Sequence, residues 1–287
     1  MTRYRFGRPT APAFAAVIAA AVGLALTPAL TPAWVLEAAA APADPSAAAA
    51  APVESRTACK VIPSLDRLDY PLARVSRHLE EDRPIKIVAI GSSSTAGAGA
   101  SSPEASYPSR LEAELTRHFQ WNDITILNRG ANGEEAGDML ARFDTSVVAE
   151  KPDLVIWQMG TNSVLRDRPF DPKATVLHEG LARLKAVHTD VILLDPQFAP
   201  KFNAKPDAEE VVAQIAATAK EQSVDLFHRF ALMRRWHQID HLPFDAFVSP
   251  DGVHMNDWSY GCLAKWLGTA IVEAATRPAT TASRPLH

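Results

Sequence analysis

Three consecutive serines follow an apolar run in the first third of the chain. Residues 87–90 are apolar throughout, and Gly91 then precedes Ser92, Ser93 and Ser94. A serine hydroxyl is a weak nucleophile at its own pKa, so it needs a neighbouring base and donors for an oxyanion. A buried strand that ends in small hydroxyl residues can present such a nucleophile at the edge of a sheet. The pattern predicts a nucleophile here, although such strand ends are more often simple turns.

A carboxylate and an imidazole lie three residues apart near the other end of the chain. Within the segment 249–254, one turn lets Asp251 reach a ring nitrogen of His254, which leaves the other nitrogen for a serine. Gly133 can present a backbone N–H with no side chain in the way, and Asn162 can supply a side-chain N–H. Together these residues predict nucleophilic catalysis by a serine with a base, an orienting acid and an oxyanion site.

Alternating strand and helix patterns predict how these residues come together. Apolar strand segments are expected at 85–90, 124–127, 154–158, 191–194 and 224–227. Helices are expected at 71–81, 107–119, 134–149, 174–187, 209–222, 231–236 and 256–275. This alternation predicts an α/β fold with a parallel sheet covered by helices on both faces. The polar segments that follow the strands would then gather at the carboxyl edge of the sheet.

Four of these segments resemble the sequence blocks of the SGNH (GDSL-type) hydrolases. The segments are Gly91-Ser92-Ser93-Ser94-Thr95, the glycine-bearing 128–133, Gly160-Thr161-Asn162 and Asp251-Gly252-Val253-His254. Their order and spacing match, and the resemblance spans about residues 85–275. It implies a three-layer sandwich with a five-stranded parallel sheet, the flavodoxin-like SGNH hydrolase fold.

The resemblance implies a role for each matching residue. Ser93 is implied as the nucleophile, His254 as the base and Asp251 as the acid that orients it. The backbone N–H groups of Ser93 and Gly133 and the side chain of Asn162 are implied as the oxyanion hole. The implied activity is that of a serine esterase that hydrolyses carboxylic esters in two steps, with no metal or organic cofactor.

One position departs from the family pattern. The family usually has Gly-Asp-Ser where this chain has Gly91-Ser92-Ser93. Because that aspartate is not the acid of the triad, its loss need not abolish the chemistry. The choice among the three serines therefore depends on alignment, and Thr95, two residues after the nucleophile as usual in the family, favours Ser93.

The chain begins with the order of a secretory signal. Arginines at positions 3, 5 and 8 precede an apolar segment, 13–26, that is too short to span a bilayer comfortably. Residues 1–41 are predicted to be a signal peptide, with an uncleaved anchor as the alternative. The Ala/Pro-rich residues 42–58 are predicted to be a disordered linker, 59–278 the hydrolase domain and 279–287 a tail. The protein is therefore expected to be exported, either periplasmic or secreted.

The net charge limits the classes of binding partner, and the cysteine content bears on whether the chain contains a disulfide. The 29 basic and 33 acidic residues give a formal net charge of −4, which argues against nucleic acid or an anionic membrane as the main partner. Cys59 and Cys262 are the two cysteines, and in an exported chain such a pair is compatible with a disulfide. Spacing alone cannot show proximity, so two free buried thiols remain the alternative.

Other polar residues have simpler interpretations. Gln197 follows a predicted strand, so it is a candidate for substrate binding, with a turn hydrogen bond as the alternative. His237 and His241 are four residues apart but lack the glutamate of the H-E-x-x-H pattern, so no metal is predicted. Arg166 is expected to be an ordinary exposed arginine, and Trp157 is expected in the core.

Export, and the lack of a long lid or a strongly apolar segment in the predicted domain, favour short acyl esters. The expected partner is a small ester or an acylated glycan, such as one that carries O-acetyl groups. One alternative is an O-acyltransferase acting on cell-envelope or exopolysaccharide glycan. A lipase- or lysophospholipase-type esterase and a non-catalytic glycan-binding member are the others. The sequence makes no prediction of the oligomeric state.

Overall fold

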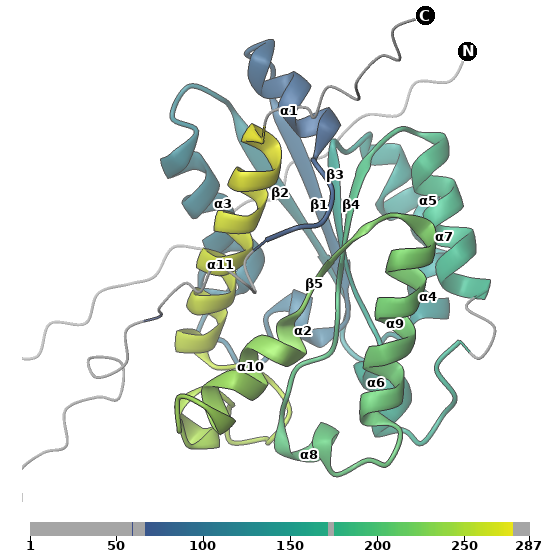
Figure 1. Ribbon diagram of the computed structural model, residues 1–287, viewed down its shortest axis with the longest axis vertical. Coiled ribbons are helices and arrows are strands. Elements are labelled where there is room, and N and C mark those ends of the chain that lie inside the picture. The colour runs from purple at the N-terminus through teal and green to yellow at the C-terminus, as the bar shows by residue number, and fades with distance from the viewer. Residues whose placement is uncertain (1–58, 60–66, 172–174, 278–287) are drawn as a thin grey trace, which may run out of the picture. The chain divides into compact units, whose positions relative to one another are not determined.

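The computed structural model describes residues 59, 67–171 and 175–277 (Figure 1). The predicted signal peptide at 1–41, the linker at 42–58 and the tail at 279–287 lie outside the described residues. All described residues belong to one unit of the chain, residues 50–287.

A five-stranded parallel sheet forms the centre of this unit, with the strand order β2-β1-β3-β4-β5. The strands are β1 (Ile85–Gly91), β2 (Ile124–Gly130), β3 (Leu154–Gln158), β4 (Asp190–Leu194) and β5 (Asp225–Phe227). Ile87 on β1 pairs with Ile126 on β2 and with Leu154 on β3. β3 is buried along its whole length, as expected for a parallel strand covered on both faces. This topology confirms the predicted flavodoxin-like α/β fold.

Helices cover both faces of the sheet, which gives the predicted three layers (Figure 1). One face carries α1 (Ala73–Glu80), α3 (Tyr107–His118) and α11 (Asp257–Thr276). The other face carries α4 (Ala136–Ala141), α5 (Phe143–Ser146), α7 (Thr175–Ala186) and α9 (Ala208–Gln222). The sequence explains the firm start of α11, because the Asn256 side chain accepts a hydrogen bond from the Ser259 N–H at 3.1 Å. Leu263, Trp266 and Leu267 then bury the helix against its neighbours.

Short helices replace loops at the carboxyl end of the sheet. They are α2 (Ser93–Ala96), α6 (Thr161–Leu165) and α8 (Pro200–Asn203), which follow β1, β3 and β4. The sequence did not predict them, because four or five residues are too few to show a helical period. α10 (Arg229–Gln238) and 3₁₀ turns at Pro103–Ala105, Val148–Glu150 and Phe244–Ala246 complete the described elements.

The predicted helix over 134–149 is not continuous. It is divided into α4, α5 and a 3₁₀ turn, and Arg142 lies at the first break. There the Arg142 guanidinium turns back to the Glu134 carboxylate at 2.6 Å and to the Arg129 carbonyl at 2.7 Å. These contacts connect the end of β2 to the start of α4, close to Gly133.

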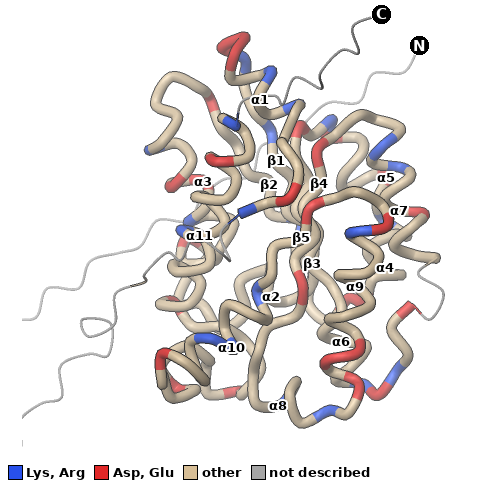
Figure 2. The backbone as a smooth tube through the Cα atoms, viewed as in Figure 1, with Lys and Arg blue, Asp and Glu red and all other residues tan. Residues whose placement is uncertain are grey.

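Charged residues of both signs are interspersed over the helices and loops in the view of Figure 2. No large area of basic residues alone is visible there among the described residues, in agreement with the formal net charge of −4. Within residues 67–171 and 175–277, no helix is long and apolar enough to cross a membrane.

A disulfide joins Cys59 to Cys262 on α11. The two Cα atoms are 5.5 Å apart, although 203 positions separate the residues in sequence. Cys262 is buried in the helix interface. The bridge therefore attaches Cys59 to the last helix of the domain.

Loss of this disulfide is expected to lower the free energy of unfolding. In the double variant Cys59→Ser/Cys262→Ser the decrease should be about 2–5 kcal/mol, because a long closed loop no longer restricts the unfolded chain. Urea denaturation without reductant measures the difference. Wild-type protein unfolded in dithiothreitol is the control and should match the double variant. Identical urea midpoints for oxidised wild type and the variant would show that the bridge does not stabilise the fold.

Candidate active site

The serine-rich turn lies at the carboxyl end of β1, beside the point between β1 and β3 where the strand order reverses. Sheets of this type bind ligands in the crevice at such a point. Ser92 has an extended backbone and Ser93 is the first residue of α2. The turn requires Gly91, because a Cβ there would collide with Thr95 Oγ1 and lie only 2.7 Å from Gln158 Oε1. Ser93 is thereby placed at the sheet edge.

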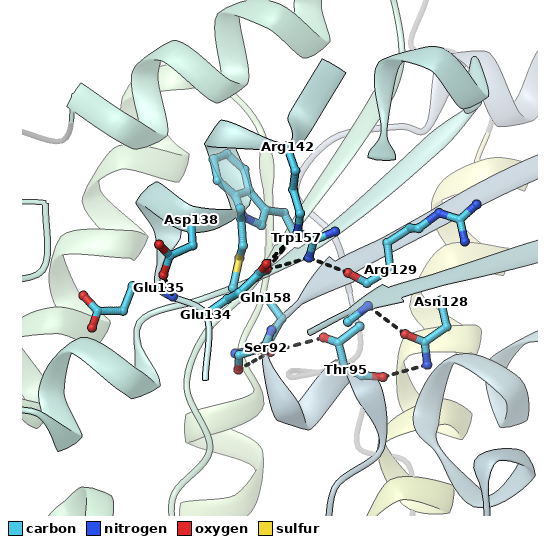
Figure 3. A network of polar contacts seen from close by, with 12 residues as sticks. Ser92, Thr95, Asn128, Arg129, Glu134, Glu135, Asp138, Arg142, Trp157 and Gln158 are labelled. Atoms are coloured by element: carbon cyan, nitrogen blue, oxygen red, sulfur yellow. Dashed lines mark hydrogen bonds and ion pairs between the residues drawn. The ribbon is translucent and has the colours of Figure 1, made fainter. Parts of the chain in front are cut away.

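The three serines have different partners. Ser93 Oγ lies 2.7 Å from His254 Nε2 and is half-buried. Ser92 is buried, and both its hydroxyl and its N–H donate to Gln158 Oε1, at 3.1 and 3.0 Å (Figure 3). Ser94 is also buried, and its hydroxyl donates to Gln197 Oε1 at 3.4 Å. Of the three hydroxyls, the one that contacts an imidazole is that of Ser93.

Asp251 orients the imidazole from the opposite side. Its Oδ2 lies 2.5 Å from His254 Nδ1, and its Oδ1 accepts from the His254 N–H at 2.9 Å. Oδ1 also accepts from the Val253 N–H and the Ser249 hydroxyl, each at 2.8 Å. Partial burial acts to raise the pKa of Asp251, but the hydrogen bonds from His254, Val253 and Ser249 outweigh it and hold that pKa well below its usual range.

An ionised Asp251 fixes the tautomer of His254. With the Nδ1 proton held by the carboxylate, Nε2 carries a lone pair and accepts the hydrogen bond from the Ser93 hydroxyl. A serine, an imidazole and a carboxylate in this series can remove the hydroxyl proton and stabilise the imidazolium that forms. The arrangement is therefore suited to acyl transfer.

The implied oxyanion donors come from the ends of β1, β2 and β3. Gly133 has φ +79°, a left-handed conformation that glycine adopts without strain, and the Ser93 N–H is at the first turn of α2. Asn162 Nδ2 donates to the Glu134 carbonyl at 2.9 Å, next to Gly133. That contact orients the Asn162 amide and connects two of the three implied donors.

Arg166 is exposed, as expected, and its guanidinium also forms an ion pair beside the candidate site. Its Nη1 donates to Glu135 Oε1 at 2.8 Å, and its Nη2 lies 3.1 Å from where a Cβ of Gly133 would be. The Arg168 guanidinium shares the same Glu135 oxygen at 3.2 Å. The Arg166 guanidinium is thus fixed by its ion pair with Glu135 at the edge of the candidate site.

The side chain of Gln197, the predicted candidate for substrate binding, is fully buried, which favours the alternative of an internal hydrogen bond. Gln197 Oε1 accepts from the Thr161 hydroxyl at 3.0 Å, and Nε2 donates to the Val253 carbonyl at 3.2 Å. Gln197 lies three residues after the end of β4, where it is buried among the loops at the carboxyl end of the sheet. Gln197 therefore contacts the polypeptide around the site.

Gln158 is a site residue that sequence reasoning missed. Besides Ser92, its Oε1 accepts from the Thr95 hydroxyl at 3.1 Å, so one buried amide holds both ends of the serine turn (Figure 3). The Asn128 amide adds a bond to the Thr95 carbonyl at 2.9 Å (Figure 3). The available signal was a polar residue that ends an otherwise apolar strand shortly before Gly160.

The remaining candidates have structural contacts. His237 Nδ1 bonds the Leu242 carbonyl at 2.9 Å, and its ring stacks on Phe244 with centroids 4.1 Å apart. Among the described residues, no group of three or more His, Cys, Asp or Glu side chains is arranged to hold a metal ion. Trp157 is fully buried, as predicted, and its ring packs against that of Phe143.

Known proteins are similar in sequence to parts of this chain. An arylesterase from Vibrio mimicus is 28% identical over 120 residues, which cover 42% of this chain and 58% of the relative. An acetylxylan esterase from Geobacillus stearothermophilus is 29% identical over 118 residues, covering 36% and 54%. The chain thus spans less than two thirds of the length of either relative.

Solved structures show the same fold. A two-domain esterase active on acetylated mannans superposes with a TM-score of 0.60 at 19% identity, over 77% of this chain and 58% of the other. A mutant of an acetyl-xylooligosaccharide esterase from Geobacillus superposes with a TM-score of 0.55 at 20% identity, over 65% and 94%. The model of the Non-GDSL lipase-like family matches residues 58–277, a range that includes every described residue. With the strand order and the four sequence blocks in place, the chain belongs to the Non-GDSL lipase-like family, within the SGNH-type hydrolases.

Proposed function

We propose that this protein is an exported serine esterase that removes short acyl groups, in particular O-acetyl groups, from carbohydrate. The observation that carries the proposal is the series Ser93–His254–Asp251, with 2.7 Å between Ser93 Oγ and His254 Nε2 and 2.5 Å between His254 Nδ1 and Asp251 Oδ2. These distances lie within hydrogen-bond reach, as a nucleophile, its base and the group that orients the base require.

The proposed reaction has two steps. Ser93 Oγ attacks the ester carbonyl carbon while His254 Nε2 takes its proton, and Asp251 stabilises the imidazolium. The oxygen of the tetrahedral intermediate receives hydrogen bonds from the N–H groups of Ser93 and Gly133 and from Asn162. His254 then protonates the leaving alcohol, and an acyl group remains on Ser93. A water molecule, deprotonated by His254, attacks that acyl group and releases the acid.

Two observations support the choice of substrate and compartment. Proteins with this fold include an esterase active on acetylated mannans and an acetyl-xylooligosaccharide esterase, and a relative in sequence is an acetylxylan esterase. The signal-like order of residues 1–41 supports export to where such polysaccharides are found.

Acyl-chain preference tests the proposed substrate class. The kcat/KM of the purified protein for p-nitrophenyl acetate is expected to exceed that for p-nitrophenyl palmitate by about tenfold or more, as a site shaped for a small acyl group would discriminate against a long one. Release of acetate from acetylated xylan extends the test to a polymer. The Ser93→Ala variant serves as the blank for both assays. Faster hydrolysis of the palmitate ester would contradict the proposal and favour a lipase-type activity.

A further inference from the structure

Gln197 connects the segments that carry the nucleophile, one oxyanion donor and the base. Its Oε1 accepts from Thr161 Oγ1 at 3.0 Å and from Ser94 Oγ at 3.4 Å. Its Nε2 donates to the Val253 carbonyl at 3.2 Å. Ser94 follows Ser93, Thr161 precedes Asn162, and Val253 precedes His254. A single buried amide thus contacts a sequence neighbour of each of three candidate site residues.

Residues 249–254 form the segment that carries His254, and most of the hydrogen bonds of this segment are formed within it. The Asp251 carboxylate accepts from the N–H groups of Val253 and His254, and the Ser249 N–H donates to the His254 carbonyl at 2.8 Å. Two bonds connect it to the segment after β4. They are the bond from Gln197 Nε2 to the Val253 carbonyl and the bond from the Lys201 N–H to the Gly252 carbonyl at 3.0 Å. Together with the close packing of Gly99 against His254, these two bonds place the imidazole relative to the sheet edge.

Gln158 does not duplicate this connection. Its Oε1 bonds Ser92 and Thr95, so it fixes the serine turn to β3, and these bonds do not reach the segment 249–254. Gln197 is the buried amide that bonds the serine turn and the histidine segment at once. A rigid planar amide with an acceptor on one side and a donor on the other sets the separation of the two.

We infer that Gln197 is a positioning residue that sets the distance between His254 Nε2 and Ser93 Oγ without touching the substrate. This inference rests on the proposed function of Ser93 and His254. Its physical basis is that catalytic groups held in a reactive geometry lose rate steeply when displaced, and a shift of about 1 Å can cost about 100-fold. Substrate binding, in contrast, does not use the Gln197 amide, which is fully buried.

Two substitutions separate the bonds. Gln197→Met has a similar length and loses all three hydrogen bonds. Gln197→Glu keeps an acceptor for Thr161 and Ser94 but loses the donor to the Val253 carbonyl. The matched control is Gln214→Met on α9, which removes an amide bonded to the Asp171 carbonyl, outside the candidate site. Each protein is assayed with p-nitrophenyl acetate and with a fluorophosphonate probe, and the folded fraction is measured by thermal melting.

Both Gln197 variants are expected to lose about 10- to 100-fold in kcat, with KM changed by no more than about twofold. The rate constant of fluorophosphonate labelling, which reports on the reactivity of Ser93 alone, should fall in the same proportion. Gln214→Met should keep the wild-type kcat and labelling rate. A decrease in kcat and in the labelling rate, with KM unchanged, indicates a positioning role. Loss of a contact with substrate would instead raise KM.

Several outcomes would overturn the inference. One is an unchanged kcat per labelled site in both Gln197 variants. Another is a loss that only mirrors a smaller folded fraction, which would make the role structural. If Gln197→Met does not fold, Gln197→Glu and Thr161→Val decide, since each removes one bond. Absence of labelling and hydrolysis in the wild-type protein would instead reject the proposed function on which the inference rests.

Discussion

Replacement of Ser93 by alanine is expected to lower kcat/KM for p-nitrophenyl acetate by about 10⁴-fold or more. In serine hydrolases the loss of the nucleophile removes the covalent route and leaves only the hydrolysis that binding and oxyanion stabilisation support. Ser93 is the serine of the turn whose hydroxyl bonds His254 Nε2. Steady-state hydrolysis at saturating and subsaturating ester concentrations measures the effect.

The neighbouring serines provide matched controls for this prediction. Ser92→Ala loses its hydroxyl bond to Gln158 and Ser94→Ala loses a long bond to Gln197, so each variant is expected to remain active. Each should lose about 1 kcal/mol of stability, as is typical of a removed hydrogen bond. An active Ser93→Ala with an inactive Ser92→Ala or Ser94→Ala would move the nucleophile to that neighbour.

Replacement of Asp251 by asparagine is the second large effect, with an expected loss in kcat of about 10³- to 10⁴-fold. The asparagine amide can present N–H to His254 Nδ1, which favours the tautomer that carries its proton on Nε2. That tautomer cannot accept the proton of Ser93. In the wild-type protein the Asp251 carboxylate lies 2.5 Å from His254 Nδ1. It is held ionised, because hydrogen bonds from His254, Val253 and Ser249 lower its pKa. The pH–rate profile and the kcat of purified Asp251→Asn measure the loss.

A distant aspartate controls for removal of a negative charge. Asp240 forms a surface ion pair with Arg235 at 3.6 Å, and Asp240→Asn is expected to leave kcat unchanged. Retention of full activity in Asp251→Asn would contradict the assigned role and require another group to orient His254.

The parallel sheet could be predicted because its strands are buried on both faces and therefore almost continuously apolar. β3 coincides with the predicted 154–158, and β1 extends the predicted strand by one residue. β2 continues three residues further than predicted, to Gly130, since the polar residues 128–130 pair with residues 89–91 of β1. Periodicity identified the long helices but could not identify α2, α6 and α8, because four or five residues are too few to show a helical period.

Pairwise contacts at the site were less accessible from the sequence. Ser93, Asp251 and His254 lie together as the family resemblance implied, although only Ser93 follows a strand and the other two lie in the loop before α11. Gln158 bonds Ser92, 66 positions away in sequence, and Gln197 bonds Val253, 56 positions away. The sequence around each glutamine does not identify such a distant partner. Arg229 is similar: an arginine is expected at the surface, yet it is fully buried and its Nε donates to the Asp195 carbonyl at 2.9 Å.

Mapping of a fluorophosphonate adduct would show directly whether Ser93 is the nucleophile. The disulfide-bonded wild-type protein is treated with the probe, digested and sequenced by tandem mass spectrometry. The expected result is one adduct, on Ser93, and none in Ser93→Ala under the same conditions. An adduct on Ser92, on Ser94 or on any other residue, or no adduct on the folded wild-type protein, would contradict it.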